Sequence, residues 1–333
     1  MTTVLVVGLG AVGARAARQL AESGDVERVF VADADAGRAT RVAKVLGEVA
    51  TVGTWSDAGP LPPGIDVVAC AVPAGAELAV ARASVDAGVP CVSSVDDHEA
   101  IRELLALDGA AQQARTGVIV GCGLAPGLSE VLARHAAGLV DTVDEVHVAR
   151  VGVAGPASRE VVRHALRDHP LEWRAGEWYD AAQRVGHELV WFPEPVGPHE
   201  CELVAAGIWC LAEAFPDASR LSVRLGDGRV GRRFGVRHRG DDASWGSARA
   251  EVWGHCGPRR LSIVYGVVER TAVAAASVLA VAALASVGRV PGHPGIDRPG
   301  VHGLATVVEP VAFLAELARR GVKAATFEGV PAH

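Results

Sequence analysis

The chain has 333 residues, which is too long for one small core, so two domains are the expected organisation. Half of the residues are hydrophobic and 21% are charged, a composition that excludes a disordered chain. The formal net charge of −7, with no block of basic residues, disfavours a nucleic-acid partner.

The first third of the chain alternates apolar runs with helical stretches. Most of these runs are continuously hydrophobic, as in strands that are covered on both faces. The segments between the runs have apolar residues at helical spacing. This alternation predicts a doubly wound parallel sheet of the Rossmann type, an α/β fold, over residues 1–124. The expected strands are residues 3–8, 28–33, 48–53, 66–73, 90–95 and 117–123.

A different pattern begins near residue 138. Polar residues recur at every second position, which indicates antiparallel strands with one face in water. We therefore expect a second domain of the α+β class over residues 125–268. The expected strands of this domain are residues 143–153, 219–226, 232–240 and 248–255.

The last segment, residues 269–333, is expected to hold two helices joined by a Gly/Pro loop at residues 288–303. Residues 271–288 are uncharged and about long enough to cross a bilayer. They are mostly alanine and valine with two serines, and their neighbours are polar, so a buried interface helix is favoured over a membrane span. Glu309 before Pro310 predicts the start of a second helix, and Gly321 predicts its end.

The first glycine turn, "GLGAVG", follows a strand and opens a helix. Gly8 permits a tight turn, Gly10 lets the backbone approach a pyrophosphate, and Gly13 lets helix and strand pack closely. The helix start also offers free N–H groups and a partial positive charge to phosphates. We expect this turn, including Ala11 and Val12, to bind a dinucleotide.

The end of the second strand predicts which dinucleotide is bound. Asp33, followed by Ala34, lies twenty residues after Gly13 and can accept hydrogen bonds from ribose hydroxyls. A carboxylate there repels a 2′-phosphate, so NAD is favoured over NADP. Arg38 and Arg41 leave NADP open, because a nearby arginine can hold that phosphate.

A second glycine turn, "GCGLAPG", ends the sixth run. Pro126 falls where a helix would begin. The turn is expected at the carboxyl edge of the sheet, beside the first one, where it would border the nicotinamide end of the dinucleotide. An ordinary crossover into the second domain is the alternative.

Three segments resemble the saccharopine dehydrogenase-like enzymes. These are "VLVVGLGAVG", "DVVACAVPAGAELAVARASVDAGVPCVSSVDD" and "GVIVGCGLAPGLSEVLA", and looser similarity extends over nearly the whole chain. The resemblance implies an NAD(P)-binding Rossmann domain, a second domain for substrate and dimerisation, and C-terminal helices that return to the first domain. It also implies hydride transfer at a carbon bearing an amine, on amino-acid-like substrates. The residues that match the cofactor-contacting turns of the family are Ala71, Val72, Pro73, Gly123, Leu124, Pro126 and Gly127.

Two departures from the family pattern concern the substrate. Many relatives have an acidic residue where this chain has Ala125. A histidine–proline element often follows the segment that reads "PVGPHE" here, but this chain continues with "CELVAAGIW".

Two clusters supply candidate catalytic residues, since histidine is the commonest general base near neutral pH. His98 follows the fifth strand, and Asp97 beside it can orient it or raise its pKa. The alternative is that an aspartate here caps a helix. His199 with Glu200 forms the second cluster, with a solvated turn as its alternative. Candidate arginines for a substrate carboxylate are Arg163, Arg174, Arg232 and Arg233.

The six cysteines form no CxxC pair, and the chain has no HExxH motif, so we expect no metal. Scattered cysteines and the lack of a signal peptide favour the cytoplasm. The sequence therefore predicts a dimeric NAD(P)-dependent oxidoreductase acting on the amine of a small amino-acid-like molecule. Two alternatives stay open: a silent NAD(P)-binding sensor, and a Rossmann dehydrogenase acting on an aldehyde or alcohol.

Overall fold

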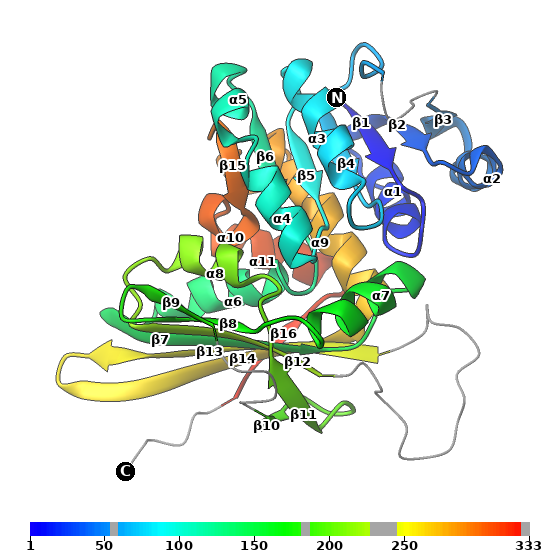
Figure 1. The fold of residues 1–333 in the computed structure, drawn as a ribbon. Coiled ribbons are helices and arrows are strands. Elements are labelled where there is room, and N and C mark those ends of the chain that lie inside the picture. The colour runs from blue at the N-terminus through cyan, green and yellow to red at the C-terminus, as the bar shows by residue number, and fades with distance from the viewer. Residues whose placement is uncertain (54–58, 181–186, 227–244, 328–333) are drawn as a thin grey trace.

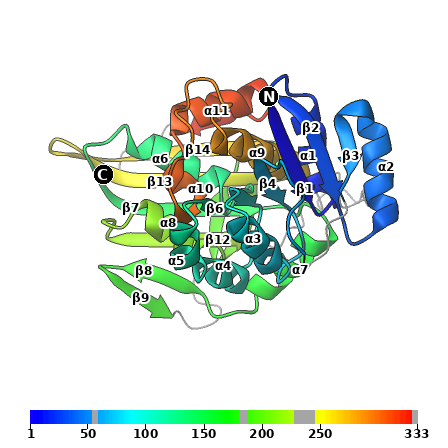
Figure 2. The same ribbon diagram turned by 90° about the horizontal axis from the view of Figure 1, so that it is seen from above.

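The computed structural model of the chain places two sheets one above the other (Figure 1). It describes residues 1–53, 59–180, 187–226 and 245–327. The upper sheet carries the N-terminus and is wrapped by helices, whereas the lower sheet is long and has helices against the face that looks toward the upper one (Figures 1 and 2).

The upper sheet is parallel throughout the described residues and confirms the Rossmann prediction. Its seven strands, in spatial order, are β15 (Gly300–Gly303), β6 (Gly117–Val120), β5 (Cys91–Ser93), β4 (Val67–Cys70), β1 (Thr2–Val7), β2 (Val26–Ala32) and β3 (Ala50–Val52). Six of them fall in the predicted runs. The seventh, β15, lies at the end of the Gly/Pro segment between the two C-terminal helices, which we expected to be a loop. It extends the sheet by pairing with β6.

Alternate residues of β1 face opposite layers of helices. Val4 and Val6 pack in the core that includes α1 and α9, whereas Leu5 and Val7 pack in the core that includes α3 and α4. Covering both faces explains why the strands are continuously apolar. The helices of this part are α1 (Gly13–Ala21), α2 (Ala36–Leu46), α3 (Glu77–Asp86), α4 (His98–Leu105) and α5 (Asp108–Gln113), with a 3-10 turn η1 at Gly47–Val49.

The lower sheet is mixed. Its nine described strands are β7 (Thr142–Val151), β8 (Leu171–Arg174), β9 (Glu177–Asp180), β10 (Glu188–Trp191), β11 (Pro198–Leu203), β12 (Arg220–Gly226), β13 (Trp245–Cys256), β14 (Arg259–Arg270) and β16 (Ala324–Phe327). The expected antiparallel pairing holds for β7 with β13, but β7 and β12 are parallel, because a long connection separates them in the chain. The expected strand at residues 232–240 lies outside the described residues.

Three helices cover the inner face of the lower sheet. They are α6 (Leu128–Ala137), α8 (Ile208–Ala214) and α9 (Thr271–Ser286). A fourth helix, α7 (Pro156–Ala165), follows β7 and lies between the two sheets, near the carboxyl ends of the Rossmann strands (Figure 1).

The Ala/Val helix α9 is buried on every side. It packs against α1, β4 and β5 of the upper sheet and against β13 and β14 of the lower one. Burial on all faces accounts for its uncharged sequence. Within the described part of the chain, no helix is long and apolar enough to cross a membrane.

Two further helices follow in the C-terminal segment. They are α10 (Leu304–Val307) and α11 (Pro310–Arg319). Glu309 caps α11 as predicted, because its carboxylate accepts hydrogen bonds from the N–H groups of Val311 and Ala312. Helix α11 packs against both α6 and α9.

One side-chain hydrogen bond joins α9 to the first Rossmann helix. Gln19 Nε2 donates to Ser277 Oγ at 2.7 Å, and Ser277 is fully buried. We expect Ser277→Ala to lower the free energy of unfolding by about 1 kcal/mol, because the amide loses its acceptor. Urea denaturation measures this, with Ser286→Ala as the control, since the Ser286 hydroxyl bonds only within α9 to Ala282. Equal losses in the two variants would show that the link contributes nothing.

Candidate functional site

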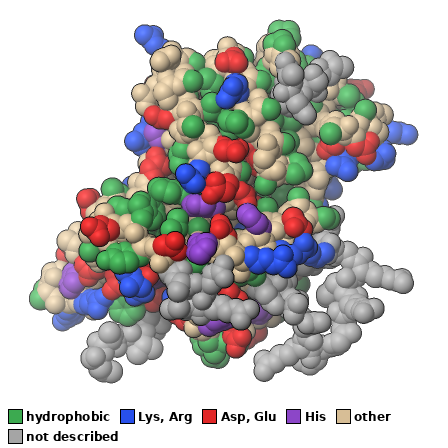
Figure 3. Space-filling model, viewed as in Figure 1, with side chains coloured by type: hydrophobic (Ala, Val, Ile, Leu, Met, Phe, Trp, Pro, Cys, Tyr) green, Lys and Arg blue, Asp and Glu red, His purple; other side chains and the backbone are tan. Residues whose placement is uncertain are grey.

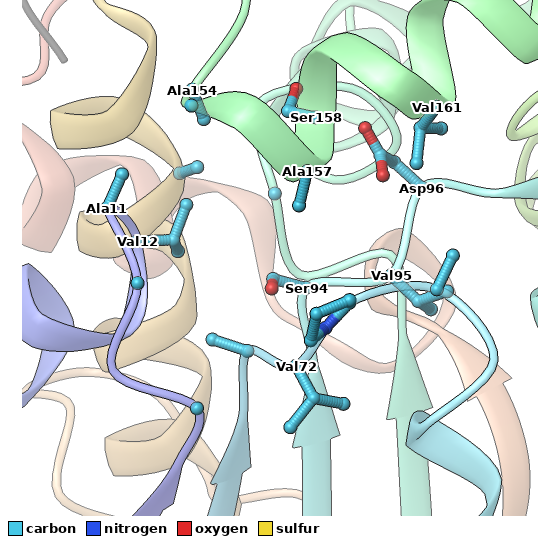
Figure 4. A pocket seen from close by; sticks show the side chains of 18 of the residues that line it. Ala11, Val12, Val72, Ser94, Val95, Asp96, Ala154, Ala157, Ser158 and Val161 are labelled. Carbon is cyan, nitrogen blue, oxygen red and sulfur yellow. The ribbon is translucent and has the colours of Figure 1, made fainter. Parts of the chain in front are cut away.

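A cavity of about 720 Å³ lies at the carboxyl ends of the Rossmann strands. Its other walls are the first turn of α7 and the N-terminal turns of α9 (Figure 4). This volume falls in the range of small-molecule and cofactor sites, and the carboxyl edge is where doubly wound sheets bind ligands.

The first glycine turn forms one wall of the cavity and fits a diphosphate. A Cβ atom at Gly8 would lie 2.5 Å from the carbonyl oxygen of Ala71, and one at Gly13 would lie 1.8 Å from that of Gly8. Both glycines are therefore required by close backbone packing. At Gly10 a Cβ atom would meet nothing within 4 Å. The open space above Gly10 is where a phosphate can approach the backbone and the start of α1.

Asp33 lies at the end of β2 on the same wall, and its side chain is only 7% exposed. Its Oδ2 accepts a hydrogen bond from the N–H of Leu9 at 2.7 Å, and Arg38 Nη1 lies 3.3 Å from both carboxylate oxygens. The carboxylate is thus fixed beside the glycine turn. Arg38 also lines the cavity, so a cation accompanies the anion at this end.

Most of the residues that the sequence assigned to the cofactor line this one cavity. They are Gly8, Gly10, Ala11, Val12, Asp33, Ala34, Ala71, Val72, Pro73, Gly123 and Leu124. Gly13, Pro126 and Gly127 do not line it. Gly13 is packed beneath the turn, and Pro126 lies against Gly207, where a Cβ atom would come within 3.1 Å of the proline.

The second glycine turn also borders the cavity, through Gly123, Leu124 and Ala125. Its helix, α6, begins at Leu128, two residues later than the position of Pro126 had indicated. Glu130 of this helix holds the turn, because its Oε2 accepts hydrogen bonds from the Gly127 N–H at 2.5 Å and the Ser129 hydroxyl at 2.7 Å.

The structure places His98 and Asp97 outside this cavity. Asp97 is the N-cap of α4, and its Oδ1 accepts from the N–H of Ala100 at 3.0 Å. His98 Nδ1 accepts a hydrogen bond from the indole N–H of Trp209 at 3.2 Å. Both residues line a small depression between α4 and α7. Figure 3 shows histidine and acidic side chains side by side near the middle of the face drawn in Figure 1.

The structure also separates His199 from the cavity. It lies on β11, its ring packs edge-on against Phe192, and its Nδ1 lies 3.4 Å from the carbonyl oxygen of Gly197. The structure therefore does not bring the two predicted catalytic clusters together.

The candidate arginines of the second domain that are described also lie elsewhere. Arg163 pairs with Glu160 on the surface of α7, and Arg174 pairs with Glu172. Arg232 and Arg233 lie outside the described residues. Among the described residues, no group of histidine, cysteine and acidic side chains is arranged to hold a metal ion.

Glu77 is a cavity residue that sequence reasoning missed. It is the first residue of α3, its side chain is 3% exposed, and its Oε2 has no hydrogen-bond partner. Burial raises the pKa of its carboxyl group to about 7, and the negative charges of Asp96 and Asp97 also raise it. A carboxyl group with such a pKa, at a cavity wall, is suited to exchange protons near neutral pH.

Arg150 is a second missed residue, and it pairs with Asp96. Its Nη2 lies 3.0 Å from Asp96 Oδ2, as an ion pair without the geometry of a hydrogen bond. Arg150 comes from the end of β7 and is 5% exposed, whereas Asp96 follows β5. Figure 4 shows the carboxylate of Asp96 directed toward the first turn of α7, near Ser158 and Val161.

Both missed residues interrupt an apolar pattern in the sequence. Glu77 precedes Val80, Ala81, Ser84 and Val85 at helical spacing, so it shares their buried face. In β7, Arg150 has the same parity as the buried Val146 and Val148, which face the core. A charge at a core-facing position was the signal available from the sequence.

Comparisons with known proteins bear on the fold. No protein-family model matches the chain. Saccharopine dehydrogenase (L-Glu forming) from Saccharomyces cerevisiae has a similar structure, with a TM-score of 0.68 and 14% sequence identity over 98% of this chain and 100% of that one. The chain therefore has a saccharopine dehydrogenase-like fold.

Two further structures are similar at TM-scores of 0.49. GenD2 from gentamicin A biosynthesis, in complex with NAD, is 16% identical over 98% of this chain and 96% of that one. Diaminopimelate (DAP) dehydrogenase from C. glutamicum, in complex with DAP, is 14% identical over 96% of this chain and 98% of that one.

Proposed function

We propose that this protein is an NAD(P)-dependent oxidoreductase that prefers NAD and acts at the C–N bond of a small amine. The observation that supports it most directly is the glycine turn, where close packing surrounds Gly8 and Gly13 while the position above Gly10 opens into the cavity. The name of the structurally similar saccharopine dehydrogenase supports the same class of reaction.

The chain offers each part of a dinucleotide a place in the cavity. The N–H groups at the start of α1 would hold the diphosphate, and Asp33 would accept hydrogen bonds from the adenosine ribose. The second glycine turn and Ser94 would flank the nicotinamide. Once bound there, the nicotinamide supplies hydride exchange, and the protein supplies position and charge.

Asp33 is expected to decide between the two nicotinamide dinucleotides. Asp33→Asn keeps the shape of the side chain but removes the charge that repels a 2′-phosphate, and it frees Arg38 to pair with that phosphate. We expect the ratio of NADP to NAD dissociation constants to fall at least about tenfold. Titration calorimetry measures the ratio, with Asp25→Asn, a change in the turn before β2, as the control. An unchanged ratio in Asp33→Asn would rule out this role.

The proposed function is tested in two steps. The first is calorimetric titration with NAD and NADP. The second is absorbance at the nicotinamide band with lysine, saccharopine, ornithine and diamines. Binding followed by absorbance change is the expected result. Binding without absorbance change on any of these substrates favours a cofactor-sensing protein, and no binding of either dinucleotide contradicts the proposal.

A further inference from the structure

The part of the cavity beyond the glycine turn holds three charged side chains, Glu77, Asp96 and Arg150, which we call the acidic recess. They come from three elements: α3, the loop after β5, and the end of β7. The recess is also lined by the small or apolar residues Leu124, Ala125, Ala157 and Val161.

Negative charge is in excess in this recess. Arg150 supplies one positive charge and is paired with Asp96 at 3.0 Å. Glu77 has no cation beside it in the described part of the chain, and its Oε2 makes no hydrogen bond. A buried carboxyl oxygen without a partner is costly, and a ligand that donates a hydrogen bond to the Glu77 carboxyl group from the cavity would remove that cost.

We propose that Glu77 is the catalytic residue that binds the amino group of the substrate and accepts its proton, and that the substrate enters the recess as an ammonium cation. This inference rests on the proposed function and deepens it. In the step assigned to Glu77, an N–H bond of the ammonium breaks, the proton passes to the carboxylate of Glu77, and the electron pair stays on nitrogen. The amine then carries the lone pair that oxidation of the adjacent carbon requires.

The acidity of Glu77 suits this step. Desolvation holds its pKa at about 7, so the carboxylate accepts a proton near neutral pH and releases it again. An arriving cation replaces the missing counter-charge and favours the ionised form. The pair of Asp96 and Arg150 is neutral as a unit and so does not compete for the amine.

The competing assignment places a substrate carboxylate on Arg150. The guanidinium of arginine suits such a group, but here Asp96 already neutralises its charge. A second carboxylate would also face Glu77. We therefore expect the recess to select cations over anions.

The test compares two five-carbon probes of opposite charge, cadaverine and glutarate, by titration calorimetry with and without saturating NAD. We expect cadaverine to bind at least about tenfold more tightly than glutarate at pH 8. Repeating the titration at pH 7 in buffers of different ionisation enthalpy counts the protons released. Because Glu77 is about half protonated at pH 7, cadaverine should release about half a proton per site.

Glu77→Gln should bind cadaverine at least about tenfold more weakly and release no proton. Glu103→Gln, the same change on the exposed face of α4, is the matched control and should behave as the wild type. The number of protons that the wild-type protein releases on binding cadaverine is measured without a variant. It therefore tests the role of Glu77 even if Glu77→Gln fails to fold.

The outcomes separate the two proposals. Tighter binding of glutarate, binding of neither probe, or cadaverine binding without proton release overturns the role of Glu77. If NAD binds normally in those cases, the proposed function still stands. If neither dinucleotide binds, the proposed function fails, and the amine titration without NAD still reports on the recess.

Discussion

Replacing Gly10 by glutamate is expected to abolish NAD binding while the protein stays folded. A Cβ atom at Gly10 meets nothing within 4 Å, so the backbone accepts the side chain without rearrangement. The new side chain would occupy the space above the turn and place a negative charge beside the diphosphate. We expect the dissociation constant for NAD to rise at least about 100-fold, measured by titration calorimetry.

The matched control is Gly109→Glu, which makes the same change at an exposed position of α5 that is also free of close neighbours. This variant should bind NAD as the wild type does. Thermal unfolding should be nearly unchanged in both variants. Wild-type affinity in Gly10→Glu would show that the open space at the turn is not where the diphosphate lies.

Glu77→Gln is expected to raise stability above neutral pH and to leave it unchanged in acid. The pKa of Glu77 rises from 4.5 to about 7 on folding, because burial disfavours its charged form. A carboxyl group with a raised pKa stabilises the folded state only while it is protonated. Wild-type stability therefore falls as the pH rises from about 4.5 to 7, and the neutral glutamine avoids this loss.

The difference between variant and wild type should approach about 3 kcal/mol at pH 8 and vanish near pH 4. Urea unfolding at a series of pH values measures it without ligand. Glu103→Gln, on the exposed face of α4, should show no such pH dependence. If the Glu77→Gln difference were the same at pH 4 and pH 8, the pKa of Glu77 would not be raised by folding, and its proposed role would fail.

Local sequence signals were enough to predict the cofactor end of the cavity. Each of these signals directly follows a strand: the turn from Gly8 to Gly13, the aspartate at the end of β2, and the glycine or proline residues after β4 and β6. Parallel strands bring their carboxyl ends to one edge of the sheet, so these signals meet there. Most neighbouring strands in this sheet are also consecutive in the chain. The positions of Asp33 and Val72 at one cavity therefore follow from the order of the elements.

The other end of the cavity could not be predicted in the same way, because it is assembled between distant segments. Glu77 and Arg150 come from α3 and β7, and only the packing of the lower sheet against the Rossmann sheet brings them near each other. His98 follows β5, as expected, but its ring nitrogen accepts a hydrogen bond from the indole N–H of Trp209 in α8. Such contacts depend on the tertiary structure, which the spacing of residues within one segment of the sequence does not predict.

Several strands and one strand direction were missed, and two of these cases have a related reason. The four residues of β15 carry too little apolar pattern to indicate a strand, and only pairing with β6 makes them one. The parallel pairing of β7 with β12 depends on the path of the chain through α7 and four intervening strands. Strand direction in a mixed sheet is a property of that path.

The central claim is that a nicotinamide dinucleotide lies across the carboxyl edge of the Rossmann sheet, with its diphosphate above Gly10. A crystal structure of the protein grown with NAD tests this most directly. We predict electron density for the diphosphate at the start of α1, the adenosine ribose at Asp33 and the nicotinamide facing the acidic recess. Density for the dinucleotide at any other place, or an empty cavity at saturating NAD, would contradict the account.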